Sequence, residues 1–140
     1  MSMLKRPEHA IEHVAKVAFH HCDPLGVAWH GRYFEWLDEA REALFASIGL
    51  GPQEIRDLGH RMYIVEAKCR YMVPLSCGDS VRVTGWFSAG QPLIRVAYDL
   101  HNERTGRWSA RATHVLAVTD PKGELLPRTP DSLLERLPVR

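Results

Sequence analysis

The feature of the sequence that most constrains its fold is one long helical stripe followed by strand-like alternation. From His30 to Ile48 mostly apolar residues recur at the spacing of a single helix face, and the stripe consists of Tyr33, Trp36, Leu37, Ala40, Leu44, Ser47 and Ile48. Gly49 and then Gly51-Pro52 end it. A helix over 30–48 would be about 28 Å long, so it needs a large apolar surface to lie against.

Alternation of apolar and polar residues predicts β-strands in much of the remaining chain. A first strand is predicted within 10–21, where Ala15, Val17 and Phe19 share a face. After the long helix and a short second helix at Pro52–Leu58, four more strands are predicted, over 61–73, 81–87, 94–100 and 108–118. Short turns join these four strands, which are therefore expected to be antiparallel.

The residue pattern within these strands makes three further predictions. In the strand over 61–73, the predicted buried face contains Tyr63, Val65, Ala67, Cys69, Tyr71 and Val73. Gly85 predicts a bend or a bulge in the next strand. In the last strand, Trp108 is predicted to share a face with Ala110 and His114.

The order of one strand, one long helix and four antiparallel strands predicts an α+β fold. An antiparallel sheet that curls around the helix would bury the apolar stripe. The 140 residues suit one domain, with a core over about 10–120 and a C-terminal tail over 121–140. A helical turn is expected in this tail at Ser132–Arg136.

Composition excludes several classes of partner. The formal net charge is +1, which gives no basic field for nucleic acid. No apolar run has the length of a signal peptide or a membrane span, so stable membrane anchoring is not expected. The cysteines are Cys22, Cys69 and Cys77. Their odd number and the absence of a C-x-x-C pair argue against a disulfide framework and favour the cytoplasm.

The segment HHCDPLGVAWHGRYFEWLDEA, residues 20–40, gathers most of the chemically active side chains. A metal site would need several ligands on one side, yet adjacent strand residues point to opposite faces, so His21 cannot join His20 and Cys22. No second cluster with metal-ligand spacing occurs, and no metal is predicted. Cys22 could be a nucleophile beside His20, but a packed, unreactive thiol is favoured.

Asp23 offers a third chemistry in this segment. It ends the first strand, seven residues before the helix opens at His30. The start of a helix has unpaired N–H groups and positive partial charge. A carboxylate beside such an anion-binding helix end is the minimal equipment for acyl transfer. The alternative is that Asp23 only caps its Pro-x-Gly turn, and on composition alone this alternative is favoured.

At these residues the sequence resembles a known family. The run Asp23-x-x-Gly26-Val27-x-x-His30-x-x-Tyr33, followed by Trp36 and Glu39-Ala40-Arg41, is similar to the signature of the hotdog-fold acyl-CoA thioesterases. The most similar type is the 4-hydroxybenzoyl-CoA thioesterase family with its Tol–Pal-associated relatives. The resemblance covers about residues 10–120. It implies a hotdog fold, in which a five-stranded antiparallel sheet wraps around one long central helix.

The resemblance also implies site residues. Asp23 would be the catalytic nucleophile or general base, and the backbone N–H of His30 would polarise the thioester carbonyl. Gly26, Val27, Trp29 and Tyr33 fall at substrate-binding positions. The implied reaction is hydrolysis of a small or medium acyl- or aryl-CoA, with no cofactor other than the coenzyme A of the substrate. A homodimer or homotetramer with active sites between subunits is also implied.

Several assignments stay open at the level of sequence. The CoA phosphates need cations, and the candidates are Arg70, Arg82, Arg95, Arg104 and Arg128. The His30 side chain could contact substrate or pack at the helix entrance, and His114 is expected to be a hydrogen-bonded core histidine. The main rival function is a non-catalytic acyl-CoA-binding or protein-interaction module on the same fold. A hotdog hydratase or dehydratase is disfavoured, because the strings N-P-x-H-x-D and H-F-P are absent.

Overall fold

A computed structural model of the chain describes residues 6–140. The order of elements is one strand, one long helix, one short helix and four strands, as predicted. These elements are β1 (Ile11–Lys16), the 3-10 turns η1 (Phe19–His21) and η2 (His30–Arg32), α1 (Tyr33–Ser47), α2 (Pro52–Asp57), β2 (Met62–Tyr71), β3 (Ser80–Ala89), β4 (Ile94–Asn102), β5 (Trp108–Val118) and α3 (Asp131–Leu134). The short helix predicted at Pro52–Leu58 is therefore confirmed as α2.

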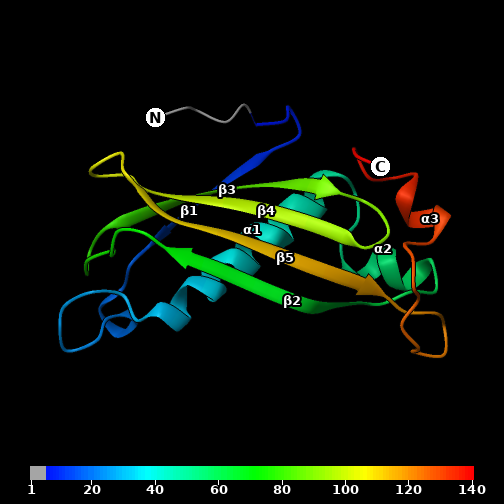
Figure 1. Cartoon of the computed structure of the whole chain (residues 1–140), viewed down its shortest axis with the longest axis horizontal. Helices are drawn as coiled ribbons and strands as arrows, with labels where there is room; N and C mark the ends of the chain where they lie inside the picture. Colours follow the sequence, from blue (N-terminus) through cyan, green and yellow to red (C-terminus); the bar gives the residue numbers. More distant parts are fainter. Residues whose placement is uncertain (1–5) are drawn as a thin grey trace.

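All five strands form one antiparallel sheet in the order β1-β3-β4-β5-β2. Figure 1 shows the sheet crossing in front of α1, which runs behind it along the sheet's length. The predicted α+β fold, a five-stranded sheet around one long helix, is confirmed. β1 and β2 are the two edges of the sheet, and within residues 6–140 neither has a strand partner on its outer side.

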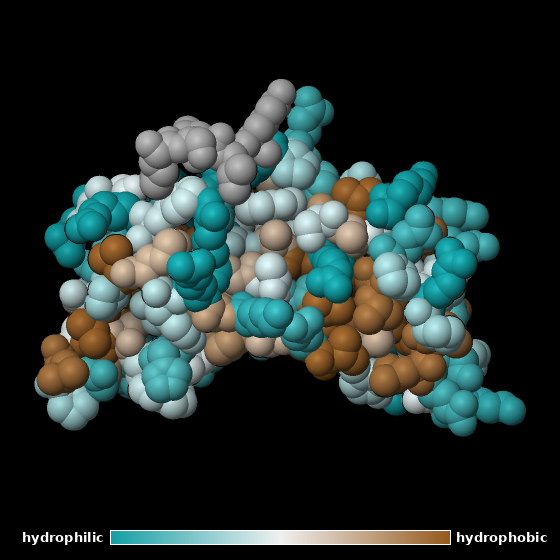
Figure 2. All heavy atoms as spheres, in the orientation of Figure 1, coloured by the Kyte–Doolittle hydropathy of each residue, from teal (hydrophilic) through white to brown (hydrophobic). Residues whose placement is uncertain are grey.

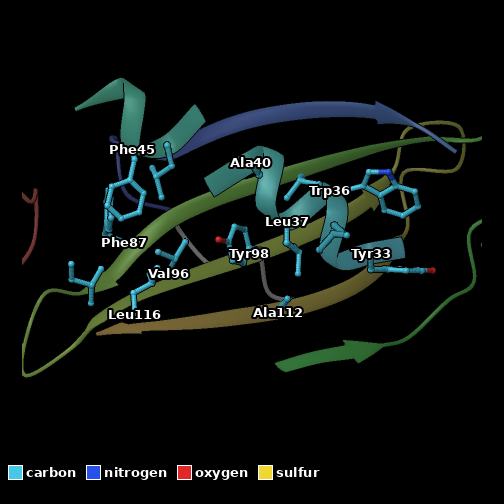
Figure 3. Close-up of a cluster of buried hydrophobic side chains, with 14 of the residues drawn as sticks. Tyr33, Trp36, Leu37, Ala40, Phe45, Phe87, Val96, Tyr98, Ala112 and Leu116 are labelled. Atoms are coloured by element: carbon cyan, nitrogen blue, oxygen red, sulfur yellow. The ribbon is translucent and has the colours of Figure 1, made fainter. Parts of the chain in front are cut away.

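The helix buries its predicted stripe against the inner face of the sheet. Six side chains of α1 are buried, namely Tyr33, Trp36, Leu37, Ala40, Leu44 and Phe45. They pack with Phe87, Val96 and Tyr98 of the sheet (Figure 3). Near the end of the helix Phe45 is buried, whereas Ser47 of the predicted stripe is exposed. The Phe45 ring packs edge-on against Phe87 with 5.0 Å between centroids.

The predicted face of β2 is wrong in its first half. The register with β5 shifts between Ile64 and Glu66, so Val65 is an extra residue that reverses the alternation before it. Tyr63 and Val65 are 50% and 48% exposed. Ala67 and Tyr71 are exposed as well, because β2 is an edge strand and α1 packs on β1 and β3 instead.

The bulges in the other strands also differ from prediction. The β3–β4 register shifts between Phe87 and Ala89, not at Gly85. Gly85 stays paired with Tyr98, and a Cβ there would lie 3.2 Å from the Tyr98 ring, so the glycine makes room for that ring. A further shift at the start of β5 pairs Trp108 with His101. The Trp108 ring consequently lies against His101 rather than on the face of Ala110.

The first strand is shorter than predicted. β1 ends at Lys16, and the ring of Phe19 is 88% exposed instead of sharing the buried face of Val17. The reason is local, since the Ala18 N–H donates to Nδ1 of His21 at 2.9 Å and closes a turn. The extended backbone that the alternation predicts is therefore interrupted before Asp23.

The segment after β5 packs back on the body of the protein. Leu133 and Leu137 are buried, and the Gly90 N–H donates to the Arg140 carbonyl at 3.1 Å. The helical turn predicted at Ser132–Arg136 corresponds to α3. Within residues 6–140, the structure contains no helix with both the length and the apolar character needed to cross a membrane.

Candidate active site

Asp23 lies in a small hairpin between η1 and η2. Cys22 pairs with Ala28 in an isolated antiparallel bridge, and the Asp23 N–H donates to the Val27 carbonyl at 2.9 Å. The turn is closed by the Gly26 N–H, which donates to the Asp23 carbonyl at 3.0 Å. Gly26 has a φ of +80°, a left-handed conformation that favours glycine. The predicted turn chemistry of this segment is confirmed.

The side chain of Asp23 has one engaged oxygen and one spare oxygen. Oδ1 accepts a hydrogen bond of 2.8 Å from the Leu25 N–H. The turn cap considered from the sequence is therefore present. In the part of the chain that the structure describes, no donor is bonded to the second carboxylate oxygen, and the residue is only half-buried. A capped carboxylate with one free oxygen can still act on a ligand.

The hairpin leads directly into the start of the helical unit. The 3-10 turn η2 begins at His30, and the Arg32 N–H donates to the Trp29 carbonyl at 2.9 Å. The predicted start at His30 is confirmed, although regular α-helix begins only at Tyr33. His30 and Gly31 come before Arg32 in the chain, so their N–H groups have no acceptor within the helix. These two groups therefore point out of the helix at its positive end.

Aromatic side chains surround the helix start. The ring of Trp29 lies 4.9 Å from that of His30, and the buried ring of Tyr33 packs edge-on against Tyr71 with 4.8 Å between centroids. A Cβ added to Gly31 would lie only 2.2 Å from the Trp29 ring, so a larger residue there would have to displace that half-exposed ring. The structure thus brings together Trp29, His30 and Tyr33, three of the predicted site residues.

Tyr71 belongs to the same cluster and was missed by sequence reasoning. Its hydroxyl donates to the His30 carbonyl at 2.7 Å. The sequence shows Tyr71 only as one apolar position at the end of a strand. No local pattern signals a contact between residues 41 positions apart.

The thiol of Cys22 has the features of a packed side chain. It donates to the Ala18 carbonyl at 3.6 Å. Burial, followed by contact with the Cys77 thiol, raises the pKa of Cys22 and disfavours the thiolate that a nucleophile requires. The rings of His20 and His21 lie against each other with 4.3 Å between centroids, so the prediction that they point to opposite faces is wrong, because residues 19–21 form the 3-10 turn η1 and not a strand. Among residues 6–140 no group of three or more His, Cys, Asp and Glu side chains could hold a metal ion.

A large cavity lies at the other end of α1. Its volume is about 990 Å³, and we call it the β2 groove because it is open along the beginning of that strand. Its apolar lining comes from α1, the 50–55 segment, β2 and β5, and comprises Phe45, Leu50, Ile55, Met62, Ile64 and Leu116. Figure 2 shows apolar surface both around the start of β2 and at the distant hairpin tip, with a hollowed outline between them.

A polar network lies beneath the groove. Nδ1 of His114 is 2.8 Å from the Tyr98 hydroxyl and 3.2 Å from Nη1 of Arg41. The same Arg41 nitrogen pairs with Asp38 at 2.8 Å. Burial and the Arg41 charge lower the pKa of His114 to about 4, so the ring is neutral at pH 7 and accepts at Nδ1. The expectation of a hydrogen-bonded core histidine is confirmed.

The five candidate arginines differ in their partners. Arg104 pairs with buried Asp79 at 2.9 Å, and Arg82 lies 3.6 Å from Glu103. Arg128 donates to the side chain of Gln91 at 3.4 Å. Over residues 6–140, only two of the five have no carboxylate or amide oxygen within bonding distance, namely Arg70 and Arg95. These two remain the cations best able to bind an anionic ligand.

Comparisons with known proteins agree with this arrangement. A family model described as the thioesterase-like superfamily matches residues 17–137. A 1,4-dihydroxy-2-naphthoyl-CoA hydrolase of Thermosynechococcus vestitus is 29% identical over 119 residues, which are 84% of this chain and 81% of that protein.

Solved structures show the same fold. A Staphylococcus aureus protein in complex with CoA gives a TM-score of 0.80 at 17% identity, covering 97% of this chain and 84% of that chain. A 4-hydroxybenzoyl-CoA thioesterase, solved as an aspartate-to-asparagine variant with 4-hydroxybenzoyl-CoA, gives a TM-score of 0.79 at 20% identity. The second match covers 91% of this chain and 98% of that chain.

Proposed function

The chain belongs to the thioesterase-like superfamily, and from that premise we propose that it hydrolyses the thioester of a small or medium acyl- or aryl-CoA. The observation that carries the proposal is the continuous unit from Asp23 to His30. A half-buried carboxylate with a spare oxygen leads, through a tight hairpin, into the unpaired N–H groups of a helix start. This pairing of a carboxylate with oxyanion donors is what acyl transfer requires.

Asp23 can act in two ways. As a nucleophile, its free oxygen attacks the thioester carbonyl, CoA leaves as the thiolate, and water hydrolyses the resulting mixed anhydride. As a general base, it takes a proton from the water that attacks the same carbon. Both routes give a carboxylic acid and free CoA. In both, the His30 N–H and the positive end of the helix stabilise the developing oxyanion.

The surroundings of the helix start support an aryl acyl group. The half-exposed ring of Trp29 lies beside the oxyanion donors, and aromatic rings bind flat apolar groups well. Tyr33 is buried in the neighbouring aromatic cluster. Gly26 and Val27 belong to the same hairpin as Asp23 and bond to its backbone. Among the related proteins, one hydrolase is named for 1,4-dihydroxy-2-naphthoyl-CoA and one thioesterase for 4-hydroxybenzoyl-CoA.

The positions of the two candidate regions support a site shared between subunits. The β2 groove lies at the start of β2, and the aromatic cluster with Tyr71 lies at its end. A strand of ten residues is about 30 Å long. If two copies pair their β2 edges in antiparallel fashion, the groove of one copy lies beside the Asp23 hairpin of the other. We therefore propose a homodimer or homotetramer as the active form.

One observation favours the rival, non-catalytic function. The bond between Asp23 Oδ1 and the Leu25 N–H is what a simple turn cap makes. A binding module would keep the groove and the aromatic cluster without using the second oxygen. Binding of acyl-CoA alone therefore cannot distinguish the two functions.

Release of free thiol from a panel of acyl-CoAs tests the proposal. The panel contains benzoyl-, hydroxybenzoyl-, acetyl-, octanoyl- and palmitoyl-CoA, and a thiol reagent follows each reaction beside an enzyme-free control. We expect turnover of an aryl-CoA or of a short to medium acyl-CoA, with one acid formed per thiol. Saturable binding of these compounds without thiol release would support the binding module instead.

A further inference from the structure

Tyr71 connects the end of β2 to the first turn of the helical unit. Its hydroxyl donates to the His30 carbonyl at 2.7 Å, and its ring packs edge-on against Tyr33 and, at 6.1 Å, against His30. In Figure 1 the arrowhead of β2 lies near the start of α1. Burial and the neighbouring Cys69 thiol raise the pKa of Tyr71 above its usual range, so the hydroxyl stays a donor at neutral pH.

The geometry of a peptide unit links this bond to the oxyanion donors. The His30 carbonyl and the Gly31 N–H belong to one planar trans peptide, in which they point in opposite directions. A donor that fixes the carbonyl therefore fixes the N–H as well. Because helix carbonyls point toward the C-terminus, the Gly31 N–H points outward from the helix start. A hydrogen bond to the carbonyl also polarises the peptide and strengthens its N–H as a donor.

The Trp29 ring also lies against this part of the backbone. The indole ring lies so near Gly31 that a Cβ there would be 2.2 Å from it. The ring thus packs on the bare backbone at Gly31, next to the Trp29 carbonyl that accepts the Arg32 N–H at 2.9 Å. The side chain of Tyr71, from a distant strand, and that of Trp29, from the preceding residue, therefore both contact the backbone between His30 and Gly31.

We propose that Tyr71 is a positioning residue for the reaction: through the His30 carbonyl it holds the His30–Gly31 peptide so that the Gly31 N–H joins the His30 N–H as a second donor to the thioester oxygen. The role rests on the proposed thioesterase function. A purely structural role for Tyr71 needs only its ring, which packs on Tyr33. The hydroxyl, in contrast, contacts the carbonyl of the peptide whose N–H, that of Gly31, is the proposed second donor.

The substitution Tyr71→Phe tests this role because it keeps the ring and removes only the hydroxyl. We expect kcat for the best acyl-CoA to fall about tenfold, the loss typical of one hydrogen bond, while KM stays within about twofold. Amide hydrogen exchange of the free protein should become faster over residues 29–33. The matched control is Thr129→Val, which deletes a hydroxyl bonded to a different backbone carbonyl, that of Pro92 at 3.2 Å.

The outcomes separate this inference from the proposed function. If the wild type hydrolyses acyl-CoA but Tyr71→Phe keeps its kcat, the positioning role is wrong and the proposed function stands. A loss of kcat that Thr129→Val reproduces would also overturn the role, since it would reflect general destabilisation. If the wild type hydrolyses no acyl-CoA, the proposed function fails and the role fails with it. In that case the exchange data still report whether Tyr71 orders the turn.

Discussion

The two ends of α1 differ in what they offer a substrate. The first end has a carboxylate with a spare oxygen and outward-pointing N–H groups, framed by Trp29 and Tyr71. The second end has a cavity of about 990 Å³ with an apolar floor, but its central cation, Arg41, is already paired with Asp38. The reactive groups therefore lie at one end of α1, and the large cavity lies at the other.

This separation has a physical consequence. A helix of 15 residues is about 22 Å long, so one small acyl group cannot occupy both ends of α1 in the same chain. β2 touches both regions and has a free edge. Pairing of two β2 edges is the simplest way to bring a groove and a hairpin together. In the proposed dimer, one chain would therefore carry two halves of different sites.

The largest expected effect is on the chemistry at the hairpin end. Asp23→Asn keeps the size of the side chain and the acceptor for the Leu25 N–H but removes the charge. We expect kcat to fall by at least about a hundredfold, the usual lower contribution of one acid–base group. Acyl-CoA affinity and the midpoint of thermal unfolding should change little.

The control for this prediction is Cys22→Ala. The Cys22 thiol packs against the Ala18 carbonyl, and its raised pKa makes it a poor nucleophile. Most of the activity should therefore remain. If Asp23→Asn turns over normally while Cys22→Ala is inactive, the carboxylate is only a turn cap and the cysteine is the nucleophile.

A smaller effect is expected at the groove end. Ile64→Glu places a carboxylate in an apolar groove whose rim already carries Asp38, Glu39 and Glu42. We expect kcat/KM to fall about tenfold, mainly through KM, because the substrate loses apolar contact there. The matched control is Val14→Glu, an exposed apolar residue on the other edge strand, opposite Arg82. Equal losses in both variants would show that the groove has no special role.

The smallest effect concerns the stability of the groove end. Burial places the pKa of His114 at about 4 in the folded protein, below the usual value near 6.5 in the unfolded chain. The unfolded state therefore binds the proton more tightly, so this stability is present above pH 6.5 and is lost as the pH falls toward 4. Between pH 7 and 5.5 the loss should be about 1 kcal/mol in the free energy of unfolding.

Urea unfolding at several pH values measures this loss. His114→Gln retains an acceptor for Arg41 and Tyr98 but cannot take up a proton in this range. The variant should therefore show a flatter dependence of stability on pH than the wild type. Identical slopes for the two proteins would contradict the assignment of His114 as a buried neutral ring.

The sequence allowed the fold to be predicted because its periodicity is strong and local. The stripe from Tyr33 to Leu44 and the four alternating runs predict the helix and the strands without knowledge of their partners. The bulges at Val65 and Ser88 could not be predicted, because an extra residue depends on the register with the neighbouring strand. The face of β2 was wrong for this reason.

Only the part of the candidate site that lies in one continuous segment could be predicted from the sequence. The segment from Asp23 to Tyr33 is continuous, so its turn and its helix start can be recognised from residue types. The contact of Tyr71 with His30 and the β2 groove depend on the fold, because they join residues far apart in the chain. Periodicity contains no information about such contacts, and the groove was absent from the prediction.

A mixed oligomer tests most directly whether the two ends form one site across two chains. Asp23→Asn and Ile64→Glu chains with different tags are co-expressed, and the mixed species is isolated. If each site combines Asp23 of one chain with the β2 groove of the other, the mixed dimer has two unlike sites. One site has Asp23 and Ile64 both intact, and the other has both substituted. We predict about half of the wild-type kcat/KM. If each chain holds a complete site, the mixed dimer will show only the average of the two parents, about 5% of wild type, from the hundredfold and tenfold losses expected above.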